Sequence, residues 1–387
     1  MKRCSLLCAG LALTASLATA QPAATPAATT KPAAGPKIEV CFVLDTTGSM
    51  SGLIEGAKRK VWSIANTLLS GTPTPQLRIG LVGYRDRGDA YVTKRFDLSD
   101  DLDAVYGNLT TFSAGGGGDT PESVNQALAE AVKDISWSTG SDTYRVIFLV
   151  GDCPPHMDYK DDVKWPDTVK EALGRDIIVN TVQCGAFGET GPIWREMALK
   201  GEGKYVQIDQ GGGMSSVASP FDAEIAKVNA SLARTVVAYG SARQQTEMAG
   251  KAGAMAAAPA TVAADRAMTL GARFDGAVVT GAGDLVQDMA AGRANLGQLK
   301  VEELPENMRK MTPAEREAYL KEQAASRKVL QAQFDELNRK RQAFVDAETK
   351  RLAAAGGGDA FDQKVLEMVA SQAERKGISY AKPAGEK

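Results

Sequence analysis

The chain has 387 residues, of which 44% are hydrophobic and 24% are charged, so it is long enough for two domains with buried cores. Its 45 basic and 47 acidic side chains leave a net charge of −2, and no basic cluster interrupts this balance, so nucleic-acid binding is not expected. The single histidine, His156, excludes metal centres that need several imidazole ligands.

Residues 1–20 have the pattern of a secretory signal peptide. Lys2 and Arg3 precede an apolar run, and small residues end the segment at Ala20, where we expect cleavage. The run is shorter than the roughly 20 residues that a membrane-spanning helix needs, and no later segment is apolar enough. We therefore expect an exported protein, periplasmic or secreted, without stable membrane insertion.

A leader rich in Pro, Ala and Thr covers residues 21–36 and is expected to be flexible. After it, strand-like and helical segments alternate. The strand-like segments are 38–44, 77–84, 91–96, 144–150, 176–183 and 204–208. The helical segments are 53–69, 102–109, 121–135, 168–173 and 193–199, with a closing helix at 221–239. This alternation predicts an α/β domain over residues 37–240, with a doubly wound, mostly parallel sheet covered by helices on both faces.

The composition changes near residue 241. Residues 241–262 are rich in Ala and Gly and are interpreted as a linker or a weak helix, and residues 263–387 as a helical region that is partly coiled-coil-like. Within it, Thr312 and Glu315 form a capping-box pattern at the start of a long helix.

An apolar stripe runs along this long helix, which extends to about residue 355. The stripe consists of Leu330, Phe334, Leu337 and Phe344, and Arg341 interrupts it. Such a stripe forms either a short coiled-coil seam for self-association or partner binding, or a face packed on the helix's own domain.

The segment FVLDTTGSM, residues 42–50, places Asp45, Thr47 and Ser49 in a turn after the first strand. Ligands of parallel α/β sheets collect where strands end and helices begin. Oxygen ligands of this kind suit a hard cation such as Mg²⁺. The alternative is helix capping, with Ser49 or Ser51 as the cap and Asp45 complementing the helix dipole.

Two further loops of similar chemistry follow, SAGGGGDTPES at 113–123 and VGDCPPH at 150–156. Together the three loops resemble the metal-ion-dependent adhesion site of the von Willebrand factor type A family. Asp45, Thr47 and Ser49 match its D-x-S-x-S element, with threonine replacing the first serine, and Asp152 matches its later acid. The resemblance covers residues 38 to about 240. It implies Mg²⁺ at the C-terminal edge of the sheet, with Ca²⁺ or Mn²⁺ as alternatives.

The middle loop departs from the family pattern, which often reads G-x-T-x-T. Gly118 stands where the coordinating threonine usually lies, so we expect Thr120 to be the ligand, with Asp119 as the alternative. The resemblance implies binding rather than catalysis, with an acidic side chain of a partner protein completing the coordination of the metal. His156 and Gly118 are expected at the rim that the partner contacts.

We expect no enzymatic activity, because a Ser-His-Asp triad would require Ser49 or another serine near His156, and Ser49 is better explained as a metal ligand. The competing hypothesis is a structural scaffold that acts through its C-terminal helices, with the metal only stabilising the domain.

Cleavage of the signal peptide leaves three cysteines, Cys41, Cys153 and Cys184. In the sheet of the type A family the strands that end at Cys153 and Cys184 are neighbours. The resemblance therefore implies that a disulfide could join these two residues near the metal edge and leave Cys41 as a buried thiol. The alternative is that the cysteines are small buried hydrophobic residues.

Overall fold

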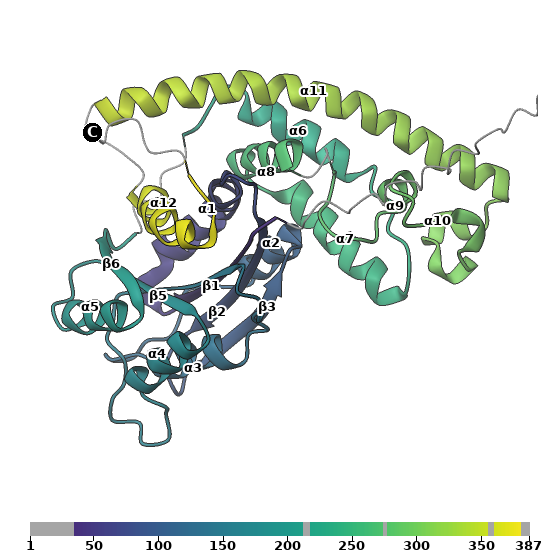
Figure 1. The fold of residues 1–387 in the computed structure, drawn as a ribbon. Helices are drawn as coiled ribbons and strands as arrows, with labels where there is room; N and C mark the ends of the chain where they lie inside the picture. Colours follow the sequence, from purple (N-terminus) through teal and green to yellow (C-terminus); the bar gives the residue numbers. More distant parts are fainter. Residues whose placement is uncertain (1–34, 212–216, 274–276, 355–359, 381–387) are drawn as a thin grey trace, which may run out of the picture. The chain divides into compact units, whose positions relative to one another are not determined.

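A computed structural model describes residues 35–211, 217–273, 277–354 and 360–380 (Figure 1). The expected signal peptide, and the leader except for its last two residues, lie outside the described residues. No helix in the described part of the chain is both long enough and apolar enough to cross a membrane.

Six strands form one sheet in the order β3-β2-β1-β4-β5-β6. The strands are β1 (Lys37–Asp45), β2 (Gln76–Tyr84), β3 (Thr93–Ser99), β4 (Thr143–Gly151), β5 (Ile177–Cys184) and β6 (Glu202–Ile208). Only β3 runs antiparallel to its neighbour, and the other pairings are parallel. The chain winds outward in both directions from β1, so the predicted doubly wound sheet is confirmed.

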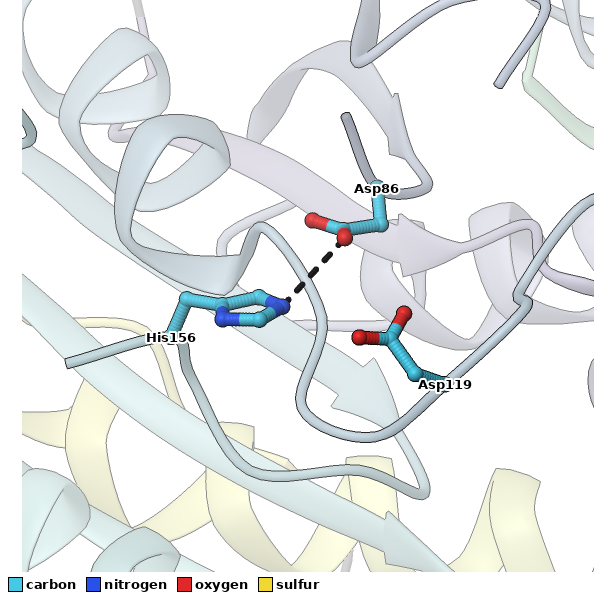
Figure 2. Close-up of side chains that lie close together, drawn as sticks. All are labelled: Asp86, Asp119 and His156. Atoms are coloured by element: carbon cyan, nitrogen blue, oxygen red, sulfur yellow. Dashed lines mark ion pairs between the residues drawn. The ribbon is translucent and has the colours of Figure 1, made fainter. Parts of the chain in front are cut away.

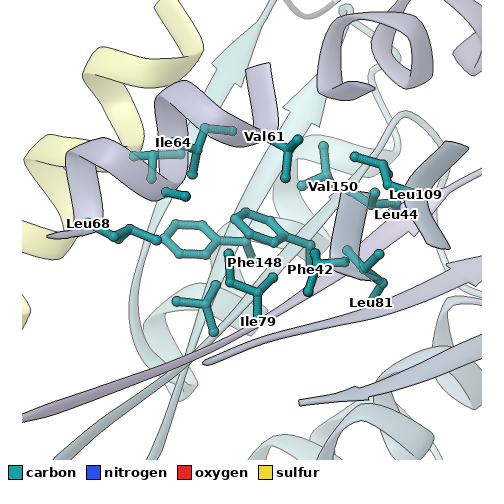
Figure 3. Close-up of a cluster of buried hydrophobic side chains, with 14 of the residues drawn as sticks. Phe42, Leu44, Val61, Ile64, Leu68, Ile79, Leu81, Leu109, Phe148 and Val150 are labelled. Carbon is teal, nitrogen blue, oxygen red and sulfur yellow. The ribbon is translucent and has the colours of Figure 1, made fainter. Parts of the chain in front are cut away.

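The central strands are apolar along their length because both faces of the sheet are covered. In β1, Phe42 and Leu44 join one buried cluster, and Cys41 and Val43 join the cluster on the other face. Figure 3 shows the first cluster, in which the rings of Phe42 and Phe148 stack with centroids 5.6 Å apart. The two-residue period of a strand thus divides β1 between two cores.

Helices cover both faces of the sheet. The first cluster includes side chains from α1 (Ser51–Leu69) and α2 (Leu102–Thr110). The second includes side chains from α3 (Val124–Lys133), α4 (Trp165–Gly174) and α5 (Thr190–Lys200). The α1 helix begins directly after the turn that carries Ser49, so the same segment supplies the cover of the sheet and part of the candidate site.

The remaining elements follow the sheet. They are α6 (Asp222–Ala233), α7 (Ala242–Ala257), α8 (Ala260–Arg273), α9 (Leu285–Ala290), α10 (Glu306–Arg309), α11 (Pro313–Ala354) and α12 (Ala360–Ala373), with the short 3₁₀ helices η2 (Leu296–Gln298), η3 (Val301–Glu303) and η4 (Glu374–Lys376).

Residues 241–262, for which a linker or a weak helix was expected, are helical rather than an irregular linker. Ser241 and Gln244 form a capping box that starts α7, and Met248 and Met255 are buried. Alanine has the highest helix propensity, and the two buried methionines provide a packed face, so the segment is a structured part of the protein.

The long helix α11 begins at the expected capping box. The backbone N–H of Glu315 donates to Thr312 Oγ1 over 3.3 Å, and the backbone N–H of Thr312 donates to Glu315 Oε2 over 2.7 Å. Phe334 and Leu337 of the apolar stripe are buried in a cluster with residues of α6, α7 and α8. This part of the stripe therefore packs on its own chain.

The arginine on the stripe has two acidic partners. Arg341 pairs with Asp222 at 2.9 Å and with Asp265 at 2.9 Å, and its side chain is 4% exposed. Arg341, which would weaken a coiled-coil seam, therefore joins α11 to α6 and α8 through these two ion pairs. Phe344, at the end of the stripe, stays exposed.

The C-terminal helix α12 covers part of the sheet. Met368 and Val369 belong to the same buried cluster as β1 and β4. The carboxamide of Gln372 accepts from Tyr144 Oη at 2.6 Å and donates to Asn180 Oδ1 at 2.9 Å. The apolar core of the sheet therefore includes side chains from far beyond residue 240.

A buried ion pair joins α8 to α2. Arg266 donates to both oxygens of Asp103, at 2.7 and 2.8 Å, and also to the carbonyl of Val278. Asp103 accepts in addition from the backbone N–H of Thr280 at 2.8 Å. Arg266 is 1% exposed and Asp103 is 3% exposed, so both charges depend on these contacts.

We expect Arg266→Ala to lower the free energy of unfolding by about 3–5 kcal/mol, because it leaves the carboxylate of Asp103 buried without its cation. Urea denaturation followed by circular dichroism measures the change. Arg243→Ala is the matched control, since the exposed pair of Arg243 with Glu247 on α7 contributes roughly 0.5 kcal/mol or less. Equal midpoints for the two variants would contradict the prediction.

Candidate metal centre

The turn after β1 holds Asp45 in a buried position. Asp45 Oδ1 accepts from the backbone N–H of Thr47 at 2.8 Å and from its hydroxyl at 2.6 Å. The hydroxyls of Thr47 and Ser49 lie 3.3 Å apart. Asp45 Oδ2 is buried and has no hydrogen-bond partner within the described residues. A buried carboxylate oxygen without a donor is unfavourable unless a cation compensates it.

The helix-capping alternative for this turn is not supported. A short 3₁₀ helix, η1 (Gly48–Met50), precedes α1, and no side chain caps either helix through a hydrogen bond. The hydroxyl of Ser49 instead faces that of Thr47. The oxygens of the turn are therefore grouped around Asp45 rather than used to begin the helix.

A second acid follows the neighbouring strand. Asp152 comes directly after β4, and its Oδ2 accepts from Gln210 Nε2 at 2.7 Å. Its Oδ1 is buried and unpartnered in the described part of the chain. A Cβ on Gly151 would lie 3.0 Å from Asp45 Cβ and 2.3 Å from Tyr84 Oη. Glycine at this position is what allows the end of β4 to approach Asp45 so closely.

The third acid is Glu122, which the sequence interpretation did not assign to the site. A Cβ on Gly117 would lie 3.1 Å from Thr47 Cβ and 3.2 Å from Glu122 Oε1, so Thr47 and Glu122 both flank this glycine. Glu122 is 2% exposed, and its Oε2 has no partner among the described residues. Its position just before the first apolar residues of α3 is the signal that could have identified it.

Thr120 and Asp119 are the two residues expected to complete the first site. Thr120 is exposed, and it makes no hydrogen bond with Asp45 or Asp152 among the described residues. Asp119 is also exposed and lies with Asp86 and His156. The loop therefore presents Glu122 to the first site and Asp119 to a different group. Gly118 is exposed.

Burial and neighbouring acids raise the pKa values of Asp45 and Glu122 in the first site. Burial raises the pKa of Asp45 to about 7, opposed by the hydrogen bonds from Thr47 and reinforced by the charge of Asp152. Burial raises the pKa of Glu122 to about 9, and the charge of Asp45 is the largest of several that add to this effect. The site thus lacks positive charge, and its oxygen ligands fit a hard divalent cation.

The disulfide that the family resemblance suggested between Cys153 and Cys184 is not formed, since all three cysteines in the described residues are free. The side chain of Cys184 belongs to the apolar cluster on the α1 face of the sheet, while Cys153 lies beside Asp152. Neighbouring strand ends alone do not bring two sulfur atoms together. Burial raises the pKa of the Cys153 thiol, and the charge of Asp152 raises it further, so it stays protonated.

A second group of side chains lies beside this site. Figure 2 shows Asp86, Asp119 and His156, each of which places one nitrogen or oxygen atom within 4.8 Å of the others. His156 was expected at an exposed rim but is 5% exposed, and its Nε2 lies 3.3 Å from Asp86 Oδ2. The backbone N–H of His156 donates to the carbonyl of Glu122 at 3.0 Å, which places the two groups side by side.

Residues 39–182 match the family model of the von Willebrand factor A domain. No curated protein matches the chain. Among solved structures, the conserved hypothetical protein BatB from Bacteroides thetaiotaomicron is 18% identical, with 44% of this chain and 90% of BatB covered and a TM-score of 0.35. Proximal thread matrix protein 1 from the mussel byssus is 13% identical, with 47% and 44% covered and a TM-score of 0.37. The chain thus spans less than half of the mussel protein.

With divalent cations removed, we expect the free energy of unfolding to fall as the pH rises from about 5 to 9. The folded-state pKa values of Asp45 and Glu122 lie above their ordinary values, so the folded chain binds more protons than the unfolded chain in this window. The contribution is therefore present at low pH and is lost as the pH rises. A pKa that differs by one between the folded and unfolded chain changes the free energy of unfolding by about 1.4 kcal/mol.

Urea denaturation at several pH values in EDTA measures this slope. Glu122→Gln and Asp45→Asn remove one titrating group each, so the slope should be shallower in each variant. Curves for the variants that run parallel to that of the unmodified chain would contradict the prediction.

Proposed function

Residues 39–182 form a von Willebrand factor A domain, and from this premise we propose that the chain is a protein-binding module whose interaction depends on a divalent cation. The observation that carries the proposal is the meeting of three buried carboxyl groups at one edge of the sheet. Asp45, Asp152 and Glu122 each have an oxygen with no hydrogen-bond donor among the described residues. A cation is the natural partner for such oxygens.

The side chains that would hold the cation are Asp45, Thr47, Ser49, Asp152 and Glu122. All five offer oxygen, which favours Mg²⁺, and Ca²⁺ or Mn²⁺ are alternatives of similar ligand preference. Mg²⁺ bound there supplies positive charge and a coordination position for an acidic side chain of a partner protein. Ser49 is exposed, so the group is open to solvent and to a partner.

Apolar side chains at the same edge of the sheet support a protein partner. Met157, in the loop after β4, is 47% exposed, and Phe187, after β5, is 44% exposed. Large apolar side chains that remain exposed beside a polar site are typical of surfaces that bind proteins. Together with Gly118 they would form the rim around the cation.

We propose binding without catalysis. The hydroxyl of Ser49 has Thr47 as its neighbour, whereas the ring of His156 is bonded to Asp158 and faces Asp86. Ser49 and His156 are therefore not bonded to each other as a nucleophile and its base would be. Export to the periplasm or beyond is also part of the proposal, and the signal-peptide pattern of residues 1–20 supports it.

A second candidate function is a scaffold that acts through its C-terminal helices, including by self-association. The observation in its favour is that Val329 and Phe344 of α11 are 60% and 38% exposed. Under this alternative the cation would only stabilise the domain.

We expect Mg²⁺ to raise the melting temperature of the chelator-treated chain. A ligand at 100 times its Kd stabilises the folded state by about 2.7 kcal/mol. Asp152→Asn and Ser49→Ala should weaken the effect, because each removes a ligand oxygen. Glu196→Ala is the control, since its exposed pair with Lys200 on α5 is unrelated to the site. An equal Mg²⁺ effect in all variants would place the ion elsewhere.

We also expect the immobilised chain to capture a protein from a native extract in Mg²⁺ but not in EDTA. Asp45→Ala should abolish the capture, because it removes the central carboxylate, and Glu196→Ala should retain it. Mass spectrometry of the eluates measures both outcomes. Capture that persists in EDTA would reject the metal-bridged mechanism, and capture retained by Asp45→Ala would favour the scaffold.

A further inference from the structure

The cluster of Asp86, Asp119 and His156 is not explained by the first site. Asp86 follows β2, Asp119 lies in the glycine loop, and His156 lies in the loop after β4 (Figure 2). The three residues thus come from three separate segments. None of the three side chains belongs to the group of ligands around Asp45. Their atoms are close enough for a single ion to contact all three after small side-chain movements.

The orientation of His156 is fixed by its surroundings. Its Nδ1 lies 2.8 Å from Asp158 Oδ1, and its ring stacks on Tyr159 with centroids 4.0 Å apart and planes inclined by 10°. Its Nε2 is buried and makes no hydrogen bond with the described residues, although it points toward Asp86. A buried imidazole nitrogen that makes no hydrogen bond and lies 3.3 Å from a carboxylate oxygen is suited to bind an ion that the carboxylate also contacts.

Asp86 is held in place by two hydroxyl groups. Its Oδ1 accepts from Ser123 Oγ at 2.7 Å, and its Oδ2 accepts from Tyr159 Oη at 2.8 Å. Each carboxylate oxygen has two lone pairs, so Oδ2 retains one for a further contact. Asp119 makes no comparable contact in the described residues and is exposed, which leaves its carboxylate available.

We propose that Asp86, Asp119 and His156 bind a second divalent ion, Zn²⁺, at a site separate from the Mg²⁺ site. One imidazole and two carboxylates are ligands that Zn²⁺ accepts, whereas Mg²⁺ prefers oxygen alone. Histidines that bind metals usually donate their other ring N–H to a carboxylate, and Asp158 occupies this position here. Three protein ligands leave a fourth position for water or for a group of a partner.

An ion at this site would also fix the loop that carries Glu122. Ser123, the residue after Glu122, is bonded to Asp86, and the carbonyl of Glu122 accepts from the backbone of His156. Asp119 lies on the same loop. The second ion would therefore join the ends of β2 and β4 to the segment that completes the first site.

The alternative is an ion pair without metal, in which a protonated His156 is shared between Asp86 and Asp158. The two cases differ in zinc binding. The purified full chain, freed of metals with a chelator, is titrated with Zn²⁺ alone, with a chromogenic chelator as competitor, and the bound ion is counted by mass spectrometry. We expect one Zn²⁺ that a large excess of Mg²⁺ does not displace.

Four variants locate the ion. His156→Gln and Asp119→Asn should each weaken Zn²⁺ binding at least tenfold, and Asp158→Asn by about tenfold through the orientation of the ring. Asp119 is exposed, so its substitution tests the site without disturbing the core. Asp45→Asn should still bind one Zn²⁺, because Asp45 is not among the proposed ligands of this ion. Affinity that is unchanged in His156→Gln and Asp119→Asn, or lost in Asp45→Asn, would overturn the proposal, as would the absence of stoichiometric binding.

Cobalt spectroscopy distinguishes this site from one that uses the nearby thiol of Cys153. Co²⁺ bound to nitrogen and oxygen should give weak visible bands without the intense near-ultraviolet band of a thiolate ligand. The visible bands should disappear in His156→Gln and persist in Cys153→Ser. A thiolate band that is lost in Cys153→Ser would assign the ion to the thiol instead and reject the proposed ligand set.

Discussion

Repulsion among buried carboxyl groups is the constraint around which this edge of the sheet is arranged. β1 and β4 are parallel neighbours, with Leu44 opposite Val150, so the acids that follow them must end at the same edge. Thr47 donates to only one oxygen of Asp45, and burial with the charge of Asp152 raises its pKa to about 7. Buried carboxyl groups with raised pKa values destabilise the folded chain when they ionise. They are typical of sites that bind a cation or take part in catalysis.

The stability that offsets this cost comes from the two apolar cores and from helices that lie far away in the sequence. Met368 of α12 joins the core on one face of the sheet, and α8 packs on α1, where Thr269 Oγ1 donates to the carbonyl of Trp62 at 3.4 Å. The α1 helix begins beside Ser49 and contacts both α8 and α12. It is thus a continuous rigid element between the candidate metal centre and the C-terminal helices.

The sequence was sufficient to predict the sheet and the first turn of the site, because strand periodicity and strand ends are local features. Asp45, Thr47 and Ser49 were predicted as candidate ligands from such a strand end, and Asp152 was added through the resemblance to the type A family. Glu122 could not be assigned, since four consecutive glycines carry no periodicity from which the register of the loop can be read. Arg341 shows the same limit, because its acidic partners are remote in the chain, and a stripe on one helix does not reveal what covers it.

The two groups of acids are linked electrostatically through Glu122. Its pKa is raised by burial, then by Asp45 of the first group and by Asp86 of the second. A cation at the second group would favour the ionised form of Glu122, which is the form that a cation at the first group requires, so the two proposed ions would assist each other through this residue. Direct repulsion between the ions opposes this effect. However, the five carboxyl groups of the two proposed sites, once all are ionised, would carry five negative charges against the four positive charges of two divalent ions, so charge balance would allow both ions to bind.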